Sequence, residues 1–270
     1  MVTTSIAQQR SPWLWMITGL LAMALISGLN SAGSGVLALV GAVLAVLAYT
    51  LVMHLVARRS TPEIARPGAA REALHGAALG AGFIGVSVAL ITLFGVYSFT
   101  WSGRSLWSVL GSVLVVGVGA AVTEELMFRG FALQALEQLF SSRTAVVVTG
   151  MFFGVAHLLN PGANLWSALA IAIEAGVLLG VAFLWRRSIW FVVGLHFAWN
   201  STEQLLGIPV SGKAAEGLLT ADVSGPALLT GGSFGLEASI IPVLLGVALT
   251  VPMFVAARRR GMIVGKRSAR

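Results

Sequence analysis

The sequence predicts an all-α protein, a multi-pass bundle of about eight helices that cross a membrane. Three observations lead to this prediction: the composition, the length of the apolar runs and the placement of the arginines. Of the 270 residues, 57% are hydrophobic and 10% are charged, whereas a soluble domain averages about 25% charged residues. No polar block is long enough to form a soluble domain of its own, so we expect residues 1–270 to form a single membrane domain.

Apolar runs of about 17–25 residues are long enough to cross a bilayer as helices. The sequence contains eight candidates, of which the fifth and the seventh are short and the fourth is long. The runs are 13–29, 36–57, 74–97, 106 into the 130s, 145–159, 165–185, 189–206 and 240–257. A helix from 106 to 139 would measure about 51 Å at 1.5 Å per residue, so we expect this segment to tilt strongly, break or protrude.

The arginines support the count of eight spans and predict an orientation. Arginine clusters follow the second, sixth and eighth runs, and Arg143 follows the fourth, whereas the intervening turns carry almost no charge. Basic residues collect on the cytoplasmic side of membrane proteins. We therefore expect a protein of the cell membrane with both termini in the cytoplasm, and with an uncleaved first helix rather than a signal peptide.

The net charge of +7 does not indicate nucleic-acid binding. Most of the arginines lie in short turns or in the C-terminal tail, where they set the topology and meet anionic lipid. We expect the lipid bilayer as a partner and no nucleic acid. The sequence contains no cysteine, which excludes disulfides and thiolate-bound metals.

Two segments lie outside the predicted spans. Residues 61–73 contain two prolines and several charges, and we expect a short interfacial helix or turn on the cytoplasmic side. Residues 207–239 are rich in glycine and form the one long extramembrane loop of the sequence. Loops of this length are often lids or disordered segments.

Two glutamates and an arginine lie within the fourth apolar run. A charge at membrane depth costs about 2.5–3.5 kcal/mol on insertion scales, so such residues usually face a protein interior or a wet cavity and mark a function. Positions four apart share one face of a helix, whereas neighbours are about 100° apart. We therefore expect Glu125 to pair with Arg129, and Glu124 to point elsewhere, towards another partner.

Other polar residues of the apolar runs supply candidate partners for Glu124. His157 lies in the fifth run and His196 in the seventh, and Asn200 follows His196 by four residues on the same helix face. Counted from the cytoplasmic turns, these side chains lie at depths within about 11 Å of one another. We expect three helices to bring them to one polar cavity that opens towards the cytoplasm.

A carboxylate with two imidazoles and an amide suits two kinds of chemistry. In hydrolysis, the carboxylate takes a proton from water while a histidine or asparagine stabilises the oxyanion that forms. In metal binding, two histidines and a carboxylate hold an ion and leave a position open for water. The alternatives are a buried polar network that only holds helices together, or a proton relay in a transporter.

Three motifs, in this order, resemble the CAAX prenyl protease and bacteriocin-processing family, also called the Abi or lysostaphin-resistance-like family. The motifs are Glu124-Glu125-x-x-x-Arg129, Phe153-x-x-x-His157 and His196-x-x-x-Asn200, on separate predicted helices. The resemblance covers about residues 106–206, which we therefore regard as the catalytic core. It implies an intramembrane endopeptidase, a hydrolase that acts on a membrane-associated protein or peptide.

The resemblance also implies a role for each polar residue. Glu124 would be the general base that activates water. His157 would orient this water or bind a metal, and His196 with Asn200 would stabilise the oxyanion or act as ligands. Many bacterial members of the family have no prenylated substrate, so cleavage of prenylated chains does not follow from the resemblance.

The resemblance leaves the need for a metal open. The family is often described as metalloproteases, which would place Zn²⁺ on Glu124, His157 and His196, but a glutamate mechanism without tightly held zinc is also proposed for it. The His-Glu-x-x-His motif of many zinc proteases is absent. In either case Glu125 and Arg129 would support the site.

Other classes of membrane protein fit the sequence less well. Presenilin-type catalysis needs two membrane aspartates, and the single aspartate, Asp222, lies in the long loop. A rhomboid-type serine, for which Ser34 is the candidate, has no histidine at a matching level. A proton-coupled transporter and a non-catalytic immunity or scaffold protein remain as alternatives, although the halves show no repeat of the transporter kind. Glu174, in the middle of the sixth run, is a cavity residue, a partner of one of the histidines, or a carboxyl group hydrogen-bonded between helices.

Overall fold

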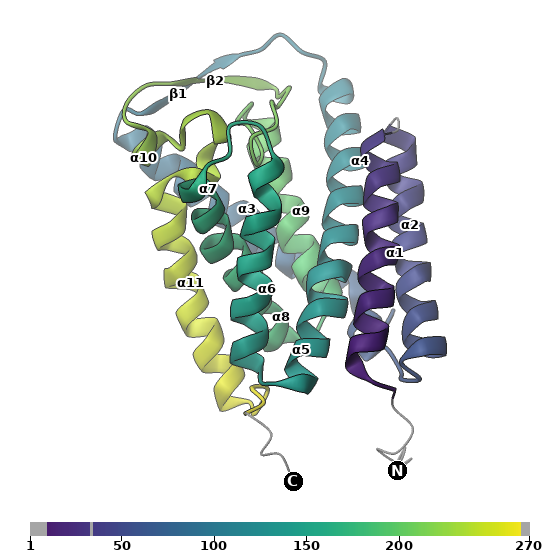
Figure 1. The fold of residues 1–270 in the computed structure, drawn as a ribbon. Helices are drawn as coiled ribbons and strands as arrows, with labels where there is room; N and C mark the ends of the chain where they lie inside the picture. The colour runs from purple at the N-terminus through teal and green to yellow at the C-terminus, as the bar shows by residue number, and fades with distance from the viewer. Residues whose placement is uncertain (1–9, 33–34, 266–270) are drawn as a thin grey trace.

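The computed structural model describes residues 10–32 and 35–265, which form a helix bundle with a two-stranded sheet at one end (Figure 1). Within these residues, seven helices are long and apolar enough to cross a membrane. This confirms the predicted all-α polytopic bundle. The predicted seventh span, 189–206, forms α9 (Ile189–Leu205), which has 17 residues and is largely buried inside the bundle.

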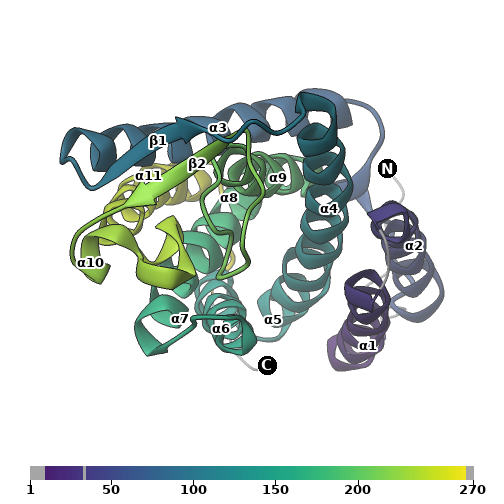
Figure 2. The same ribbon diagram turned by 90° about the horizontal axis from the view of Figure 1, so that it is seen from above.

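The first half of the chain supplies the spans that frame one side of the bundle. They are α1 (Pro12–Ala32), α2 (Gly35–Leu51) with its π-helical end η2 (Val52–Val56), α3 (Ala69–Leu93) and α4 (Leu106–Glu125). Between η2 and α3, the predicted interfacial helix or turn is a single 3₁₀ turn, η3 (Pro62–Ile64). Figure 2 shows α1 and α2 side by side at one edge of the bundle, next to α4.

The second half of the chain completes the bundle. Its helices are α6 (Ser142–Ala156) with the 3₁₀ turn η5 (His157–Leu159), α7 (Leu165–Ile171), α8 (Leu178–Arg186), α9 and α11 (Ile240–Arg259). Between α7 and α8 the helix is π-helical over η6 (Ala172–Val177). The predicted sixth span is therefore one continuous segment that changes its helical geometry in the middle.

The long fourth run is helical throughout, and it also changes geometry. α4 ends at Glu125 and continues through the π-helix η4 (Leu126–Leu133) into α5 (Gln134–Leu139). The whole segment Leu106–Leu139 has 34 residues. π-helical turns are rare, widen the helix by about one residue per turn and often occur at functional sites. The change of geometry begins directly after the two glutamates.

The backbones of α3 and α9 lie in close contact because both helices have glycines at their interface. A Cβ atom added to Gly80 would lie 2.2 Å from the carbonyl oxygen of Leu195, and one added to Gly194 would lie 2.1 Å from the carbonyl oxygen of Ala73. Small residues allow such close approach in membrane bundles, where packing replaces the hydrophobic effect as the force between helices.

We expect Gly80→Ala to lower the melting temperature of the protein in detergent, because the added methyl group forces α3 away from α9. Overpacking of this kind costs about 1–3 kcal/mol. Gly82→Ala is the matched control on the same helix, because a Cβ there would meet nothing within 4 Å. A melting temperature of Gly80→Ala equal to or above that of Gly82→Ala would contradict the close packing.

The end of the predicted third span was wrong. The helix ends at Leu93 instead of Tyr97, and residues Tyr97–Trp101 form the strand β1, which pairs antiparallel with β2 (Leu219–Val223). Gly95 has φ 69°, a left-handed conformation that favours glycine and breaks the helix. The residues that follow are aromatic or β-branched in part, which favours a strand.

The segment 207–239 is folded over one end of the bundle. It contains β2, the short helix α10 (Ala227–Thr230) and the 3₁₀ turns η7 (Gly232–Phe234) and η8 (Leu236–Ala238). The Tyr97 hydroxyl donates to the carbonyl oxygen of Thr230 at 2.6 Å and ties this segment to β1. Figure 1 shows the sheet at the end of the bundle opposite the start of α1 and the end of α11.

Candidate active site

Glu125 is the centre of a buried polar network. Its Oε1 accepts a hydrogen bond from Arg129 Nη1 at 2.9 Å and lies 2.8 Å from His196 Nδ1. The side chains of Glu125 and Arg129 are 0% and 1% exposed. The pairing predicted from their spacing on one helix face is therefore confirmed.

Arg129 joins the two π-helical sections of the bundle. Its Nη2 donates to the carbonyl oxygens of Ala175 at 3.0 Å and Gly176 at 3.1 Å, both in η6. Its guanidinium lies 4.9 Å from the centre of the Phe153 ring on α6. A buried guanidinium needs partners for its donors, and the carbonyl groups of η6 supply them. One side chain thus connects η4, η6 and α6 next to the site.

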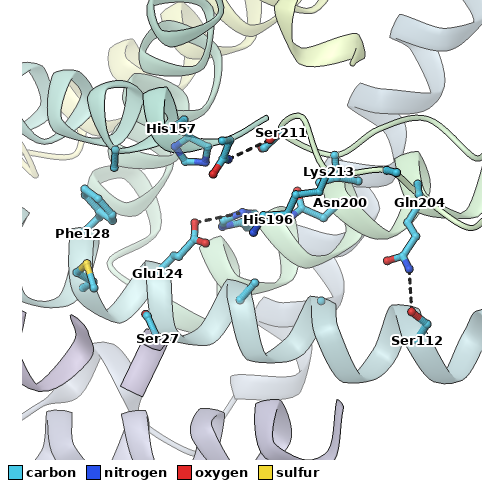
Figure 3. Close-up of a pocket in the computed structure, with 18 residues that line it drawn as sticks. Ser27, Ser112, Glu124, Phe128, His157, His196, Asn200, Gln204, Ser211 and Lys213 are labelled. Atoms are coloured by element: carbon cyan, nitrogen blue, oxygen red, sulfur yellow. Dashed lines mark hydrogen bonds and ion pairs between the residues drawn. The ribbon is translucent and has the colours of Figure 1, made fainter. Parts of the chain in front are cut away.

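The ring of His196 is oriented by Glu125 towards Glu124. A carboxylate only accepts hydrogen bonds, so Nδ1 of His196 carries the proton that it shares with Glu125. The other nitrogen, Nε2, lies 3.9 Å from Oε2 of Glu124. Figure 3 shows the Glu124 carboxylate directed at this ring. Such fixing of one ring nitrogen defines the tautomer and the direction of the other.

Glu124 differs from its neighbour in its surroundings. Its side chain is 33% exposed, compared with 0% for Glu125, and its 3.9 Å contact with His196 is longer than a hydrogen bond. As predicted, the two glutamates point in different directions. Glu124 has free acceptor capacity at the surface of a cavity, which is the condition under which a carboxylate can bind water.

His157 lies at the end of α6 and faces the same cavity. Its Nδ1 lies 2.7 Å from the carbonyl oxygen of Phe153. Because a carbonyl only accepts, Nδ1 is the donor and Nε2 of the neutral ring is left as an acceptor. The Phe153 ring packs against both imidazoles, with centroids 4.7 Å from His157 and 6.2 Å from His196. Phe153 thus fixes the spacing of the two histidines.

A pocket of about 490 Å³ joins these side chains (Figure 3). All four residues predicted as catalytic line it, from three separate spans: Glu124, His157, His196 and Asn200. Other polar lining residues are Ser27, Ser112, Asn160, Gln204, Ser211 and Lys213. Lys213 is the one lysine or arginine among the described lining residues.

The pocket extends towards the sheet end of the bundle, because residues of segment 207–239 form part of its wall. With both termini in the cytoplasm this end would face away from the cytoplasm, so the predicted cytoplasmic opening and the predicted orientation of the termini are incompatible. The position of Glu124 along its helix explains this. Glu124 lies about 25 Å from the basic end at 1.5 Å per residue, which is most of the roughly 30 Å thickness of a bilayer core.

The three predicted zinc ligands are not grouped in the described part of the chain. Among residues 10–32 and 35–265, no three His, Cys, Asp or Glu side chains are grouped closely enough to hold a metal ion. Glu124, His157 and His196 share the pocket without forming such a group. The zinc site therefore stays a prediction.

Glu237, which is not predicted from the sequence, is a carboxylate that supports one wall of the pocket. Its Oε2 accepts hydrogen bonds from the backbone N–H of Ser211 at 2.6 Å and from its hydroxyl at 2.8 Å. Burial raises the pKa of Glu237, and the hydrogen bonds from Ser211 oppose this rise. Glu237 lies in a glycine-rich loop, where no periodic pattern marks a residue as buried.

Glu237 stabilises a strained turn. Ser211 and Gly212 have φ values of 49° and 81°, as in the two-residue turns of β-hairpins. Val210 and Lys213 close this turn with two backbone hydrogen bonds of 2.9 Å. Left-handed backbone at a residue other than glycine persists only where the surroundings enforce it, and the carboxylate of Glu237 does so at Ser211.

Glu174 meets none of the three expectations for it. Its side chain is 0% exposed and is not among the lining residues of the pocket. Neither carboxyl oxygen has a hydrogen-bond partner among the described residues. Glu174 lies in η6, next to the carbonyl groups that bind Arg129.

One protein-family model matches the part of the chain that carries these side chains. The family model described as "Type II CAAX prenyl endopeptidase Rce1-like" matches residues 105–202, a segment that contains Glu124, His157, His196 and Asn200. Comparisons with curated proteins and with solved structures found no match. The family is one of membrane peptidases, which are hydrolases. Residues 105–202 are therefore similar to the Rce1-like family of CAAX-type endopeptidases.

Proposed function

We propose that this protein is an endopeptidase that cleaves a membrane-associated protein or peptide with a water molecule activated by Glu124. One observation carries the proposal. Glu124, His157, His196 and Asn200 come from three separate spans and line one pocket of about 490 Å³. A packing network would have no need to leave a carboxylate one-third exposed next to an oriented imidazole.

In this mechanism Glu124 is the general base. It takes a proton from water while the water oxygen bonds to the carbonyl carbon of the substrate. Nε2 of His157 accepts a hydrogen bond from the same water and orients it. The proton held by Glu124 then passes to the leaving nitrogen as the C–N bond breaks, which releases an acid and an amine. General acid–base catalysis of this kind contributes roughly 10²–10⁴ to the rate.

The oxyanion of the tetrahedral intermediate needs hydrogen-bond donors. The side-chain amide of Asn200 lies one helical turn after His196 and lines the same wall of the pocket. We assign Asn200 as a donor to the oxyanion, together with His196 when its ring is protonated. A donor of this kind typically contributes about 2.7–4 kcal/mol to the stability of the transition state.

The test of the proposal is a cleavage assay with the purified protein in proteoliposomes. The substrates are a library of membrane-anchored peptides, with and without a lipid group, and mass spectrometry identifies the products. Cleavage in H₂¹⁸O that places one ¹⁸O atom in the new carboxylate supports the proposal. Absence of cleavage, together with proton-coupled solute uptake by the same vesicles, would favour the transporter alternative.

The same assay separates a zinc mechanism from a glutamate mechanism. The spacing of the donors supports the glutamate mechanism, for which cleavage persists after exhaustive treatment with a chelator. Loss of cleavage on chelation and its return with Zn²⁺, together with bound zinc measured by elemental analysis, would establish the zinc mechanism instead.

We propose further that both termini lie in the cytoplasm, so that the pocket receives its substrate from the other side of the membrane. The arginine pattern supports this orientation. Because the chain contains no cysteine, single cysteines report accessibility without background. We expect an impermeant maleimide to label Asp222→Cys on intact cells, and Ser60→Cys only after lysis. The reverse pattern would overturn the orientation.

A further inference from the structure

One wall of the pocket is a stretch of backbone without hydrogen-bond partners. Residues 214–217 follow the turn at 210–213 and precede β2, and they belong to no helix or strand. Ala214 and Ala215 line the pocket. In the described part of the chain, the backbone N–H and C=O groups of Ala214, Ala215 and Glu216 have no protein partner. Such groups are a template for pairing with another chain.

This stretch is held at both ends. At its start, Lys213 exchanges two 2.9 Å hydrogen bonds with Val210, and the turn is bound by Glu237. At its end, the N–H of Leu218 donates to the carbonyl oxygen of Leu205 at 2.9 Å, and the carbonyl oxygen of Gly217 accepts from the Ser102 hydroxyl at 2.8 Å. Binding along a fixed strand loses little conformational entropy, which favours affinity.

In a strand, the direction of the backbone groups alternates along the chain. Both backbone groups of Lys213 point towards Val210. Successive residues of an extended chain point their backbone groups to opposite sides, so in a strand that continues from Lys213 through Glu216, those of Ala214 and Glu216 would point away from the turn and those of Ala215 would point back. The side chains that line the pocket here are methyl groups, which leave room for a second strand.

We infer that residues 214–216 bind the substrate as an added β-strand and so place its scissile bond across the pocket from Glu124. The occupant is the extended stretch of the substrate around its cleavage site. The inference rests on the proposed function, and the continuity of this wall with the pocket of Glu124 and His196 supports it. In recognition by strand addition, main-chain hydrogen bonds give affinity and side-chain pockets give selectivity.

Two consequences follow for the substrate. It is recognised largely through its backbone, so many sequences fit with similar affinity. It must also be extended over several residues, so a substrate that crosses the membrane as a helix must unwind at the cleavage site. Sites near the end of a helix meet this condition with fewer broken hydrogen bonds.

The experiment uses the peptide of the library that binds most tightly to the Glu124→Gln protein and a series of its variants, each with one N-methylated residue outside the scissile bond. We measure the binding of each peptide to the Glu124→Gln protein and the cleavage of each peptide by the natural protein. We expect losses of at least tenfold at every second position, with small effects between them. If the peptides are cleaved but the losses caused by N-methylation do not alternate along the peptide, the proposed strand addition is wrong. An alternating pattern in binding without any cleavage supports the strand and overturns the proposed hydrolysis.

The protein side is tested with two proline variants that differ by one position. In the proposed arrangement, Ala214→Pro removes an N–H that pairs with the substrate, and Ala215→Pro removes one that points back towards the turn. We expect at least a tenfold loss of kcat/KM for Ala214→Pro and a clearly smaller loss for Ala215→Pro. Thermal unfolding of each variant controls for folding. Equal losses in the two proline variants, or none, overturn the inference.

Discussion

Glu124→Gln should abolish peptide cleavage and leave the protein folded. The amide has the shape of the carboxylate but cannot take a proton from water. We expect kcat to fall by roughly 10²–10⁴, the contribution of general acid–base catalysis. The melting temperature should change little, because Glu124 is one-third exposed and its contact with His196 is 3.9 Å long.

Asp222→Asn is the matched control for this variant. It makes the same chemical change at an exposed residue of β2 that does not line the pocket. We expect its rate of cleavage and its melting temperature to equal those of the natural protein. If Glu124→Gln kept more than a tenth of the activity, another group would have to be the base. If it unfolded, Glu124 would have a packing role instead.

Arg129→Met should cause the largest loss of stability of any single change in the site. Methionine fits the space of the aliphatic part of arginine, but it leaves the buried carboxylate of Glu125 without its charged partner. Removal of one partner of a buried ion pair costs about 3–5 kcal/mol. The carbonyl oxygens of Ala175 and Gly176 also lose their donor. We expect a melting temperature lowered by many degrees in detergent.

The exposed ion pair between Arg104 and Glu216 provides the control for this prediction. It has a similar N–O distance, 3.0 Å, but side-chain exposures of 45% and 72%. Exposed pairs contribute about 0–1 kcal/mol, so Arg104→Met should melt close to the natural protein. We expect the double variant Glu125→Gln/Arg129→Met to regain part of the stability but not the activity, because His196 loses its orienting carboxylate. Equal melting temperatures for Arg129→Met and Arg104→Met would contradict the network.

Local spacing predicted those parts of the site that lie on one helix. Residues four apart in a helix share a face whatever surrounds them, so the pairing of Glu125 with Arg129 could be read from the sequence. The composition and the apolar runs likewise predicted the membrane bundle, because the length of a run and its hydropathy decide whether it crosses a bilayer. The order of the motifs identified the three spans that meet at the pocket.

Contacts between helices could not be predicted in this way. The sequence predicts a partner for Glu124 on another helix, but in the structure the short hydrogen bond of His196, at 2.8 Å, goes to Glu125. Which of two adjacent glutamates faces a histidine depends on the rotation of each helix about its axis, and this rotation is set by packing. The pairing of β1 with β2 joins residues more than 100 positions apart, and the support of Ser211 by Glu237 lies within a loop without periodicity.

The π-helical turns of η4 make the fourth span two helices with different phases. In a regular α-helix, a stripe of side chains continues along one face for the whole length. A wide turn shifts this stripe by about one residue. The face of α4 that carries Glu125 therefore does not continue as the same face of α5, which follows η4. Each half can therefore suit its own surroundings, the upper half a wet pocket and the lower half a dry interface. Deletion of a single residue in η4 would bring the halves back into phase and turn the glutamates away from the histidines without changing any side chain of the site.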